Sequence, residues 1–174
     1  MRTHATSTTQ VTPTLGRVSG KHRDSNPPAR PRVDSVERTL SQVGDAWTFL
    51  ILREAFFGAR RFDAFQKALS AAPNILADRL KKLVGHGILE KHRYQERPPR
   101  FEYRLTEKGR DLYPGIVLMM RWGDRWLDQG KGAPLLLVHA TCGKVSRPVL
   151  VCDRCHEPID ARVMKWRPGP AERR

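Results

Sequence analysis

The sequence predicts a mainly helical α+β domain with one small β hairpin. Apolar residues recur at helical spacing over most of residues 34–128, and alternation replaces that spacing only within residues 88–106. A basic segment rich in Ser, Thr and Pro precedes this domain, and three cysteines follow it. The predicted parts are a disordered basic arm at 1–33, the domain at 34–129, a cysteine-containing extension at 130–166 and a disordered tail at 167–174.

The composition points to a polyanionic partner. The 174 residues include 32 Lys and Arg against 18 Asp and Glu, which gives a formal net charge of +14. A solvated basic surface without a partner is the alternative. Because no apolar run approaches 18 residues and none follows the basic N-terminus, we expect neither a membrane span nor a secretory signal, and we expect a cytoplasmic protein.

Two helices should open the domain. Asp34 followed by Glu37 resembles a capping box, and the apolar spacing that follows ends at Gly44. Asp45 can cap a second helix that is apolar on nearly all sides and ends at Gly58. We expect this second helix to be the buried centre of the domain.

Two further helices should follow, the second with a polar outer face. Phe62 to Leu69 predicts a short helix, and the helix that starts at Pro73 closes at His86 and Gly87. The later helix should bury an apolar stripe of Leu76, Leu80, Leu83 and Val84. Its opposite face carries Asn74, Asp78, Lys81 and Lys82, with Arg79 at the edge.

A β hairpin with a basic tip should come next. Residues 88–94 and 101–106 have β character, and apolar residues alternate with polar ones in the second segment. Pro98 and Pro99 between them cannot continue a strand ladder, because proline lacks the N–H donor. The arginines of the hairpin are Arg93, Arg97, Arg100 and Arg104.

Three helices, the last with a basic outer face, are followed by a β hairpin with arginines at its tip, and this order predicts a winged helix-turn-helix. Such a helix can present polar side chains to base edges in the major groove, while wing arginines reach phosphates or the minor groove. The alternative is an ordinary core helix beside a solvated hairpin. The predicted DNA-binding residues are Asn74, Asp78, Arg79, Lys81, Lys82, Arg93, Arg97, Arg100 and Arg104.

A longer helix should follow the hairpin, capped by Thr106 and running to about Asp128. It carries too many apolar residues for an exposed helix, so packing on the second helix or on a second subunit should cover it. A ligand pocket lined by Trp47, Trp122 and Trp126 is the alternative use of its aromatic residues.

The sequence resembles the HxlR-type winged-helix regulators, which are relatives of the MarR group. The matching residues are Val36 to Arg38; Gly44, Asp45, Trp47, Thr48 and Leu50 to Arg53; Arg61 and Phe62; Leu76, Arg79, Leu80, Leu83, Gly87 and Leu89; Arg97 to Arg100, Glu102 and Tyr103; and Leu105, Thr106, Lys108 and Gly109. The resemblance implies a homodimer, assembled through terminal helices, that binds a palindromic operator. Many members have a reactive cysteine just before the first helix, where this chain has Asp34, so we expect a helix cap there and no thiol switch.

The extension carries the spacing of a zinc ribbon. His139 and Cys142 form HxxC, and after nine intervening residues Cys152 and Cys155 form CxxC. Two such pairs match the ligands of a tetrahedral structural zinc, with His156 as a substitute ligand. A redox-active CxxC pair and plain free thiols are the alternatives.

The leading functional hypothesis is a transcriptional regulator that represses by binding an operator in the nucleoid, with no enzymatic activity. Its partners would be double-stranded DNA, a second copy of the chain and a small-molecule effector that the sequence does not identify. A thiol-exchange enzyme is one alternative, although the chain lacks a thioredoxin-like βαβ pattern. A protein-docking module of the transcription machinery is the other.

Overall fold

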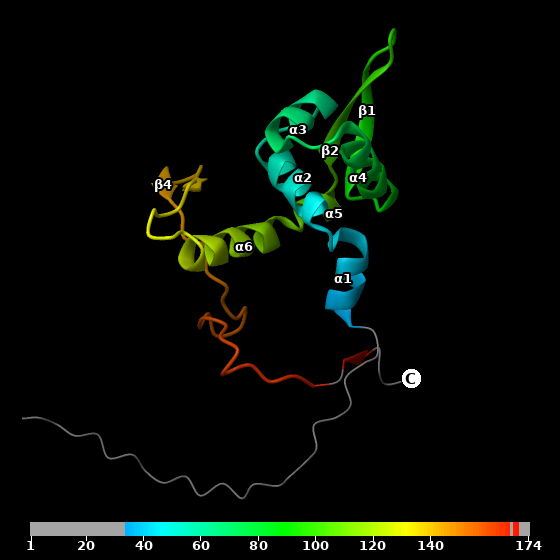
Figure 1. Ribbon diagram of the computed structural model, residues 1–174. Helices are drawn as coiled ribbons and strands as arrows, with labels where there is room; N and C mark the ends of the chain where they lie inside the picture. The colour runs from blue at the N-terminus through cyan, green and yellow to red at the C-terminus, as the bar shows by residue number, and fades with distance from the viewer. Residues whose placement is uncertain (1–33, 168, 171–174) are drawn as a thin grey trace, which may run out of the picture. The chain divides into compact units, whose positions relative to one another are not determined.

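A computed structural model describes residues 34–167 and 169–170, so the predicted arm at 1–33 and most of the predicted tail at 167–174 lie outside the described residues. None of the helices in the described part is long and apolar enough to cross a membrane. The elements in order are α1 (Ser35–Val43), α2 (Ala46–Phe56), α3 (Phe62–Leu69), α4 (Pro73–Gly85), β1 (Leu89–Gln95), β2 (Arg100–Leu105), α5 (Glu107–Arg110), α6 (Tyr113–Trp126), β3 (Val138–His139) and β4 (Lys144–Val145) (Figure 1).

The first two helices begin at the predicted caps. The Asp34 carboxylate accepts a hydrogen bond from the backbone N–H of Glu37 at 2.8 Å, and Asp45 accepts one from the N–H of Thr48 at 3.0 Å. Each bond satisfies a donor that the first helical turn leaves unpaired. Asp34 is therefore a helix cap, as its sequence context predicts.

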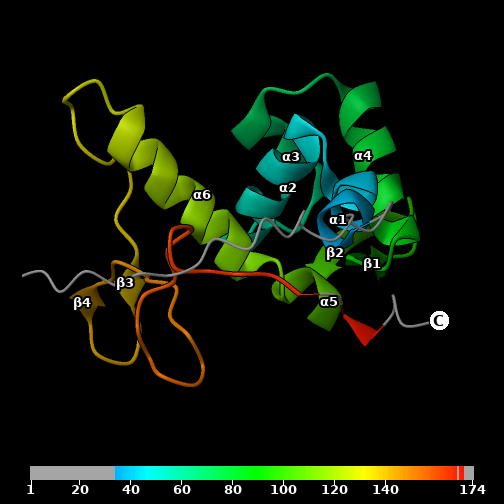
Figure 2. The same ribbon diagram turned by 90° about the horizontal axis from the view of Figure 1, so that it is seen from below.

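The core lies where α2, α3 and α4 meet the base of the hairpin (Figures 1 and 2). Its fully buried side chains include Ile51, Leu52, Phe65, Leu76, Leu80, Leu83, Ile88 and Leu89. The predicted burial of α2 and of the Leu stripe on α4 is thus confirmed. On α1 only Val43 is buried, while Val36 and Leu40 stay 64% and 51% exposed.

The helix-turn-helix consists of α3 and α4 with a three-residue turn. Ser70 ends α3 in the left-handed region with φ of 49°, and Ala71 is buried in the core. Pro73 then occupies the first turn of α4, where its missing N–H costs nothing and its fixed φ favours a helix start.

The hairpin forms an antiparallel pair in which Leu89 faces Leu105 and Arg93 faces Phe101. Residues 96–99 make the turn, so the prolines lie at the tip as predicted. The segment before α3 pairs with β2. The N–H of Tyr103 donates to the carbonyl of Arg60 at 2.7 Å, and Arg61 forms a β-bridge with Glu102. This pairing connects the hairpin to the helix-turn-helix.

The single long helix predicted from Thr106 to Asp128 is wrong in one respect, because the structure divides it into α5 and α6 with a turn at 111–112. Pro114 lies in the first turn of α6 and cannot donate to the carbonyl of Arg110, so a continuous helix would lose that bond. The rings of Phe56 and Tyr113, with centroids 4.9 Å apart, then fix the start of α6 on α2.

Candidate DNA-binding surface

The outer face of α4 presents the polar side chains that the sequence predicts. Asn74, Asp78, Lys81 and Lys82 are exposed, whereas the Leu stripe on the opposite side is buried. Asp78 does not stand free, because it pairs with Arg79 at 3.1 Å and with Lys82 at 3.0 Å. Lys81 makes no ion pair within the described residues, so it is the cation of this face that is free to meet an anionic partner.

Arg79 lies apart from this exposed set. Its side chain is 24% exposed, and its Nε is 3.1 Å from the Asp45 carboxylate at the start of α2. The Nε–H is not aligned for a hydrogen bond, so the contact is an ion pair. Arg79 thus joins α4 to α2 and sets the position of the recognition helix, a role that its place at the edge of the helix did not reveal.

Asp45 is the centre of this joint. Burial raises the pKa of its carboxyl group, but the hydrogen bonds from the side chain and backbone of Thr48 and the charge of Arg79 outweigh burial and hold the pKa below its ordinary value of 3.8. Thr48 itself is buried, with 2% of its surface exposed. The ionised form of Asp45 is therefore the one that the fold stabilises.

Replacing Asp45 should lower stability in a pH-dependent way. We expect Asp45→Ala to reduce the free energy of unfolding by about 1–2 kcal/mol at neutral pH, and Asp45→Asn, which keeps the capping oxygen, to cost less. The carboxyl group has a lower pKa in the folded state than in the unfolded state. It therefore stabilises the fold fully at a pH above the unfolded-state pKa, and this stabilisation is lost as the pH falls through the folded-state pKa.

The difference between the wild-type protein and Asp45→Asn should therefore shrink as the pH falls below 3.8. Urea unfolding followed by circular dichroism measures it. Asp34→Asn is the matched control, because Asp34 caps α1 with no ion pair to a cation in the described residues. An equal acid response of the two variants would contradict the role given to Arg79.

The wing carries both paired and unpaired cations. Arg93 pairs with Glu96 at 3.0 Å, and Arg104 Nε donates to the Glu102 carboxylate at 2.8 Å. The Arg93–Glu96 pair is exposed, and pairs of this kind contribute at most about 1 kcal/mol, so exchange of the Glu96 carboxylate for a phosphate would cost little. Arg97 and Arg100 at the tip make no ion pair in the described part of the chain.

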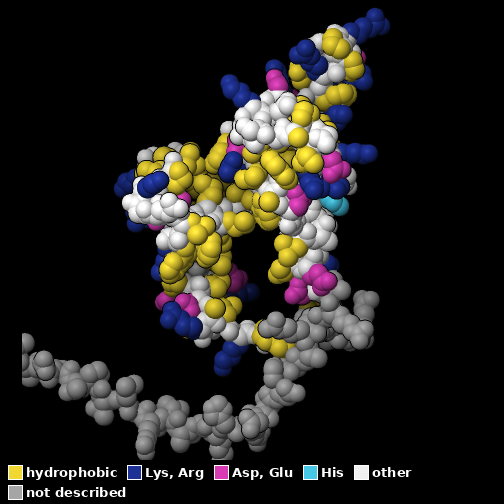
Figure 3. Space-filling view, viewed as in Figure 1, with side chains coloured by type: hydrophobic (Ala, Val, Ile, Leu, Met, Phe, Trp, Pro, Cys, Tyr) yellow, Lys and Arg dark blue, Asp and Glu magenta, His cyan; other side chains and the backbone are white. Residues whose placement is uncertain are grey.

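Figure 3 shows Lys and Arg side chains at the outer end of the hairpin. Along the hairpin, Lys91 Nζ lies 3.8 Å from the centroid of the Phe101 ring, and the Arg93 guanidinium carbon lies 5.6 Å from the same centroid. Arg61 lies over Tyr94 at 4.4 Å. These aromatic rings thus hold two further cations, Lys91 on the wing and Arg61 beside it, and the contacts depend on a strand register that the sequence alone did not give.

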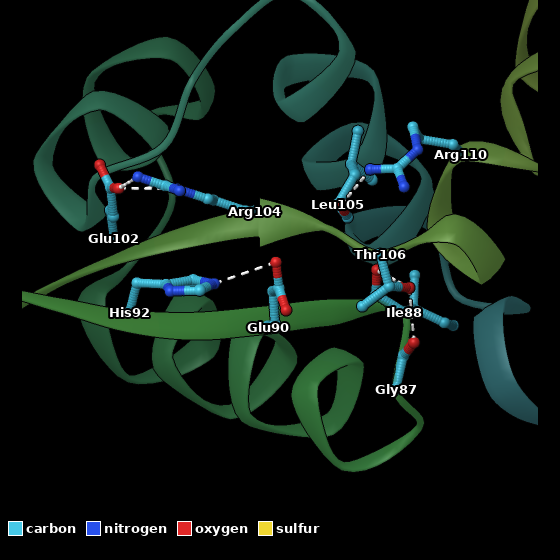
Figure 4. Close-up of polar contacts among 9 residues, drawn as sticks. All are labelled: Gly87, Ile88, Glu90, His92, Glu102, Arg104, Leu105, Thr106 and Arg110. Atoms are coloured by element: carbon cyan, nitrogen blue, oxygen red, sulfur yellow. Dashed lines mark hydrogen bonds and ion pairs between the residues drawn. The ribbon is translucent and has the colours of Figure 1, made fainter.

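The base of the wing is fixed by Thr106 (Figure 4). Its hydroxyl donates toward the carbonyls of Gly87 at 2.7 Å and Ile88 at 3.1 Å, and its oxygen accepts from the N–H of Gly109 at 3.1 Å. Arg110 donates to the carbonyl of Leu105 at 2.8 Å. Because Thr106 connects the first residues of the hairpin to α5, the wing has a defined direction relative to α4.

One apolar residue of the recognition helix escaped the sequence reasoning. Ile75 in the first turn of α4 is 36% exposed and lies beside Asn74. Its signal in the sequence was an apolar residue outside the Leu stripe. An exposed apolar side chain at this end of a recognition helix can contact the methyl group of thymine.

The structure brings the predicted metal ligands together as two pairs. Cys142 Sγ lies 3.5 Å from His139 Nδ1, and the N–H groups of Cys155 and Arg154 direct their hydrogens to the Cys152 thiol, which lowers its pKa below the ordinary 9.0. The two pairs do not form one cluster, since no group of three His, Cys, Asp or Glu side chains placed to hold a metal occurs within 34–167 and 169–170.

Comparison with known proteins decides the family. The sequence model of the HxlR-like helix-turn-helix family matches residues 42–131, from the end of α1 through α6. The chain belongs to the HxlR-like helix-turn-helix family. An uncharacterised HTH-type transcriptional regulator of this kind, Rv3095 of Mycobacterium tuberculosis, is 47% identical over 137 residues, which cover 79% of this chain and 87% of that protein.

Two solved structures described as candidate transcription factors are also similar. PA1607 has a TM-score of 0.71 at 36% identity and covers 78% of this chain and 95% of its own. PA1374 of Pseudomonas aeruginosa has a TM-score of 0.57 at 36% identity and covers 77% of this chain and 91% of its own. The HxlR resemblance and the winged helix-turn-helix predicted from the sequence are confirmed.

This HxlR-like chain is a DNA-binding transcriptional regulator. The alignment with Rv3095 is longer than the 90 residues that the family model matches, so the similarity to that relative extends past the winged helix itself.

Proposed function

We propose that the chain is a repressor that binds a palindromic operator as a homodimer. The proposal is supported by two surfaces that carry exposed cations, namely the outer face of α4, which Arg79 joins to the start of α2, and the wing, whose base Thr106 fixes. Lys81 and Ile75 would meet base edges in the major groove, while Arg97 and Arg100 would meet phosphates. The regulator would then act in the nucleoid by excluding polymerase from the promoter, with no chemistry of its own.

The exposed side of α6 supports the homodimer. Ile116 and Val117 are buried against the body, whereas Met119, Trp122 and Trp126 are 53%, 59% and 60% exposed. These three recur at i, i+3 and i+7 and so lie along one side of the helix. Trp47 packs against the core, whereas Trp122 and Trp126 are exposed on α6. These positions favour a subunit interface over a ligand pocket lined by all three tryptophans. Large exposed aromatic stripes are typical of subunit interfaces.

A groove beside α6 is the place we assign to a small-molecule effector. It has a volume of about 650 Å³ and is lined by apolar side chains of α6 and of residues 133–148. Arg121, Arg125 and Arg147 lie among them with one carboxylate, Asp124, and this excess of positive charge favours an apolar ligand with an anionic group. This size is within the range of about 300–1,000 Å³ for small-molecule sites.

Selection of bound duplexes from genomic fragments tests the DNA proposal. We expect fragments that carry an inverted repeat near promoters, and we expect the protein to lower transcription from them. Lys81→Ala should change base preference by about 1–3 kcal/mol at one position of each half-site. Arg97→Ala and Arg100→Ala should weaken all duplexes nearly equally and reduce the salt dependence of binding.

The matched control is Lys131→Ala, an exposed lysine between α6 and β3 and outside the helix-turn-helix and the wing, which should leave both affinity and preference unchanged. Equal losses on specific and random DNA for Lys81→Ala would contradict the division between base and phosphate contacts. Failure to enrich any duplex, together with co-purification of polymerase, would favour a protein-docking module instead.

A further inference from the structure

We propose that His139, Cys142, Cys152 and Cys155 bind one structural zinc ion that joins two successive hairpin loops of the extension. The proposal is independent of the DNA-binding role, because the four residues lie outside α1 to α6. It rests on the backbone of the two loops, on one interatomic distance and on the absence of a core in this part of the described chain.

The first loop has the geometry of half a zinc site. β3 and β4 form its stem, and the carbonyl of His139 accepts hydrogen bonds from the N–H groups of Cys142 and Gly143 at 3.2 and 2.8 Å. Cys142 Sγ lies 3.5 Å from His139 Nδ1. Zinc bound tetrahedrally to a sulfur at about 2.3 Å and a nitrogen at about 2.0–2.1 Å would separate those two atoms by about 3.6 Å.

The second loop repeats the first. The Cys152 N–H donates to the Glu157 carbonyl and the His156 N–H donates to the Cys152 carbonyl, both at 2.9 Å. The Arg154 N–H points to Cys152 Sγ at 3.5 Å, as a donor that would stabilise a metal-bound thiolate. Both loops therefore run ligand, two residues, ligand.

The residue that follows each ligand pair points to a backbone role for His156. Gly143 and His156 occupy equivalent positions, and both have left-handed backbones, with φ of 67° and 60°. Because the equivalent glycine has no side chain to offer, the turn at this position needs a backbone conformation and not a ligand. The ligand set is therefore His139 with the three cysteines, and His156 serves the turn.

The extension needs a cross-link because it lacks a core. Val117 in α6 is the last buried hydrophobic residue in the described part of the chain. In the extension that follows α6, Leu136, Val149 and Leu150 are 63%, 64% and 52% exposed. β3 and β4 have two residues each, too few for a hairpin that is stable alone. Small segments of this kind commonly obtain their stability from a metal.

Zinc would bring the two loops together, since the described side chains form two pairs and not yet one group. Binding would release one proton from each of the three thiols and add the two positive charges of the ion, so the extension would become less basic by one charge. Four protein ligands would leave no open position on the metal, which makes the site structural.

Metal analysis of the full-length protein, purified under reducing conditions, tests the proposal. We expect about one zinc per chain. Cys142→Ser and Cys152→Ser should each lose the metal, while helical circular dichroism stays unchanged because α1 to α6 have their own core. Cobalt substitution should give thiolate charge-transfer bands and the intense visible bands of a tetrahedral site. Chelation should expose residues 130–167 to protease and weaken DNA binding only modestly.

Two histidine variants are the controls. His156→Gly keeps the left-handed turn and removes the imidazole, and His92→Ala removes a histidine from the wing, so both should retain zinc. Metal-free protein that does not bind zinc or cobalt after reduction would overturn the proposal, and a Cys152–Cys155 disulfide in that protein would indicate a redox pair. Retention of zinc by Cys152→Ser, or its loss from His156→Gly, would overturn the ligand set.

Discussion

Trp126→Asp should convert the protein from a dimer to a monomer and lower operator affinity by about 100-fold or more. A carboxylate in an apolar interface loses its hydration without gaining a partner, which disfavours association. A monomer then binds one half-site without the gain from two linked contacts. Sedimentation at micromolar concentration gives the assembly state, and fluorescence anisotropy with the selected operator gives the affinity.

Trp166→Asp is the matched control for this experiment. It introduces the same change at a tryptophan that is 48% exposed and lies outside α6, so the variant should remain a dimer with unchanged affinity. A wild-type protein that sediments as a monomer and still binds a single half-site tightly would contradict the dimer proposal.

Gly109→Ala should destabilise the winged helix by about 3 kcal/mol, at the upper end of the range for overpacking. A Cβ at this position would lie 2.2 Å from the carbonyl oxygen of Ile88 and 3.1 Å from a methyl carbon of Leu105. The Leu105 side chain can move, but the Ile88 carbonyl belongs to the backbone at the base of the wing. The hairpin must therefore shift, and DNA affinity should fall together with the unfolding midpoint in urea.

Gly85→Ala provides the comparison. Gly85 ends α4, and a Cβ there would meet no atom within 4 Å. Because alanine favours a helix more than glycine does, this variant should be as stable as the wild-type protein or more stable by up to about 1 kcal/mol. Equal destabilisation by both substitutions would show that the close approach of α5 to the wing is not the cause.

Much of the fold could be predicted because its signals are local. Asp34 and Asp45 cap the helices that follow them, the Leu stripe of α4 is buried, and the prolines lie at the hairpin tip. Each of these outcomes depends on residues within a few positions of one another. The missed helix break was local as well, since Pro114 was a visible signal against a continuous helix.

The contacts that define the site could not be predicted, because they join residues far apart in the chain. Arg79 and Asp45 are separated in the sequence by α2 and α3 and meet only once α4 has packed on α2. The Lys91 contact with Phe101 needs the register of the hairpin. The sequence therefore supplied a group of candidate cations, and the fold divides that group into one that positions α4 and others that remain exposed.

Helix α6 connects the winged helix to the extension, so a tilt of this helix would move its two ends relative to each other. Its start is fixed to α2 by Phe56 and Tyr113, and its second half is tied to the extension by Arg121, which donates to the Pro148 carbonyl at 2.6 Å. Fourteen residues give it a length of about 21 Å. A tilt of about 10° over that length displaces the far end by nearly 4 Å, about one base-pair step of DNA. In a dimer joined through α6, a ligand that tilts this helix would move the two recognition helices out of register with half-sites spaced about 34 Å apart.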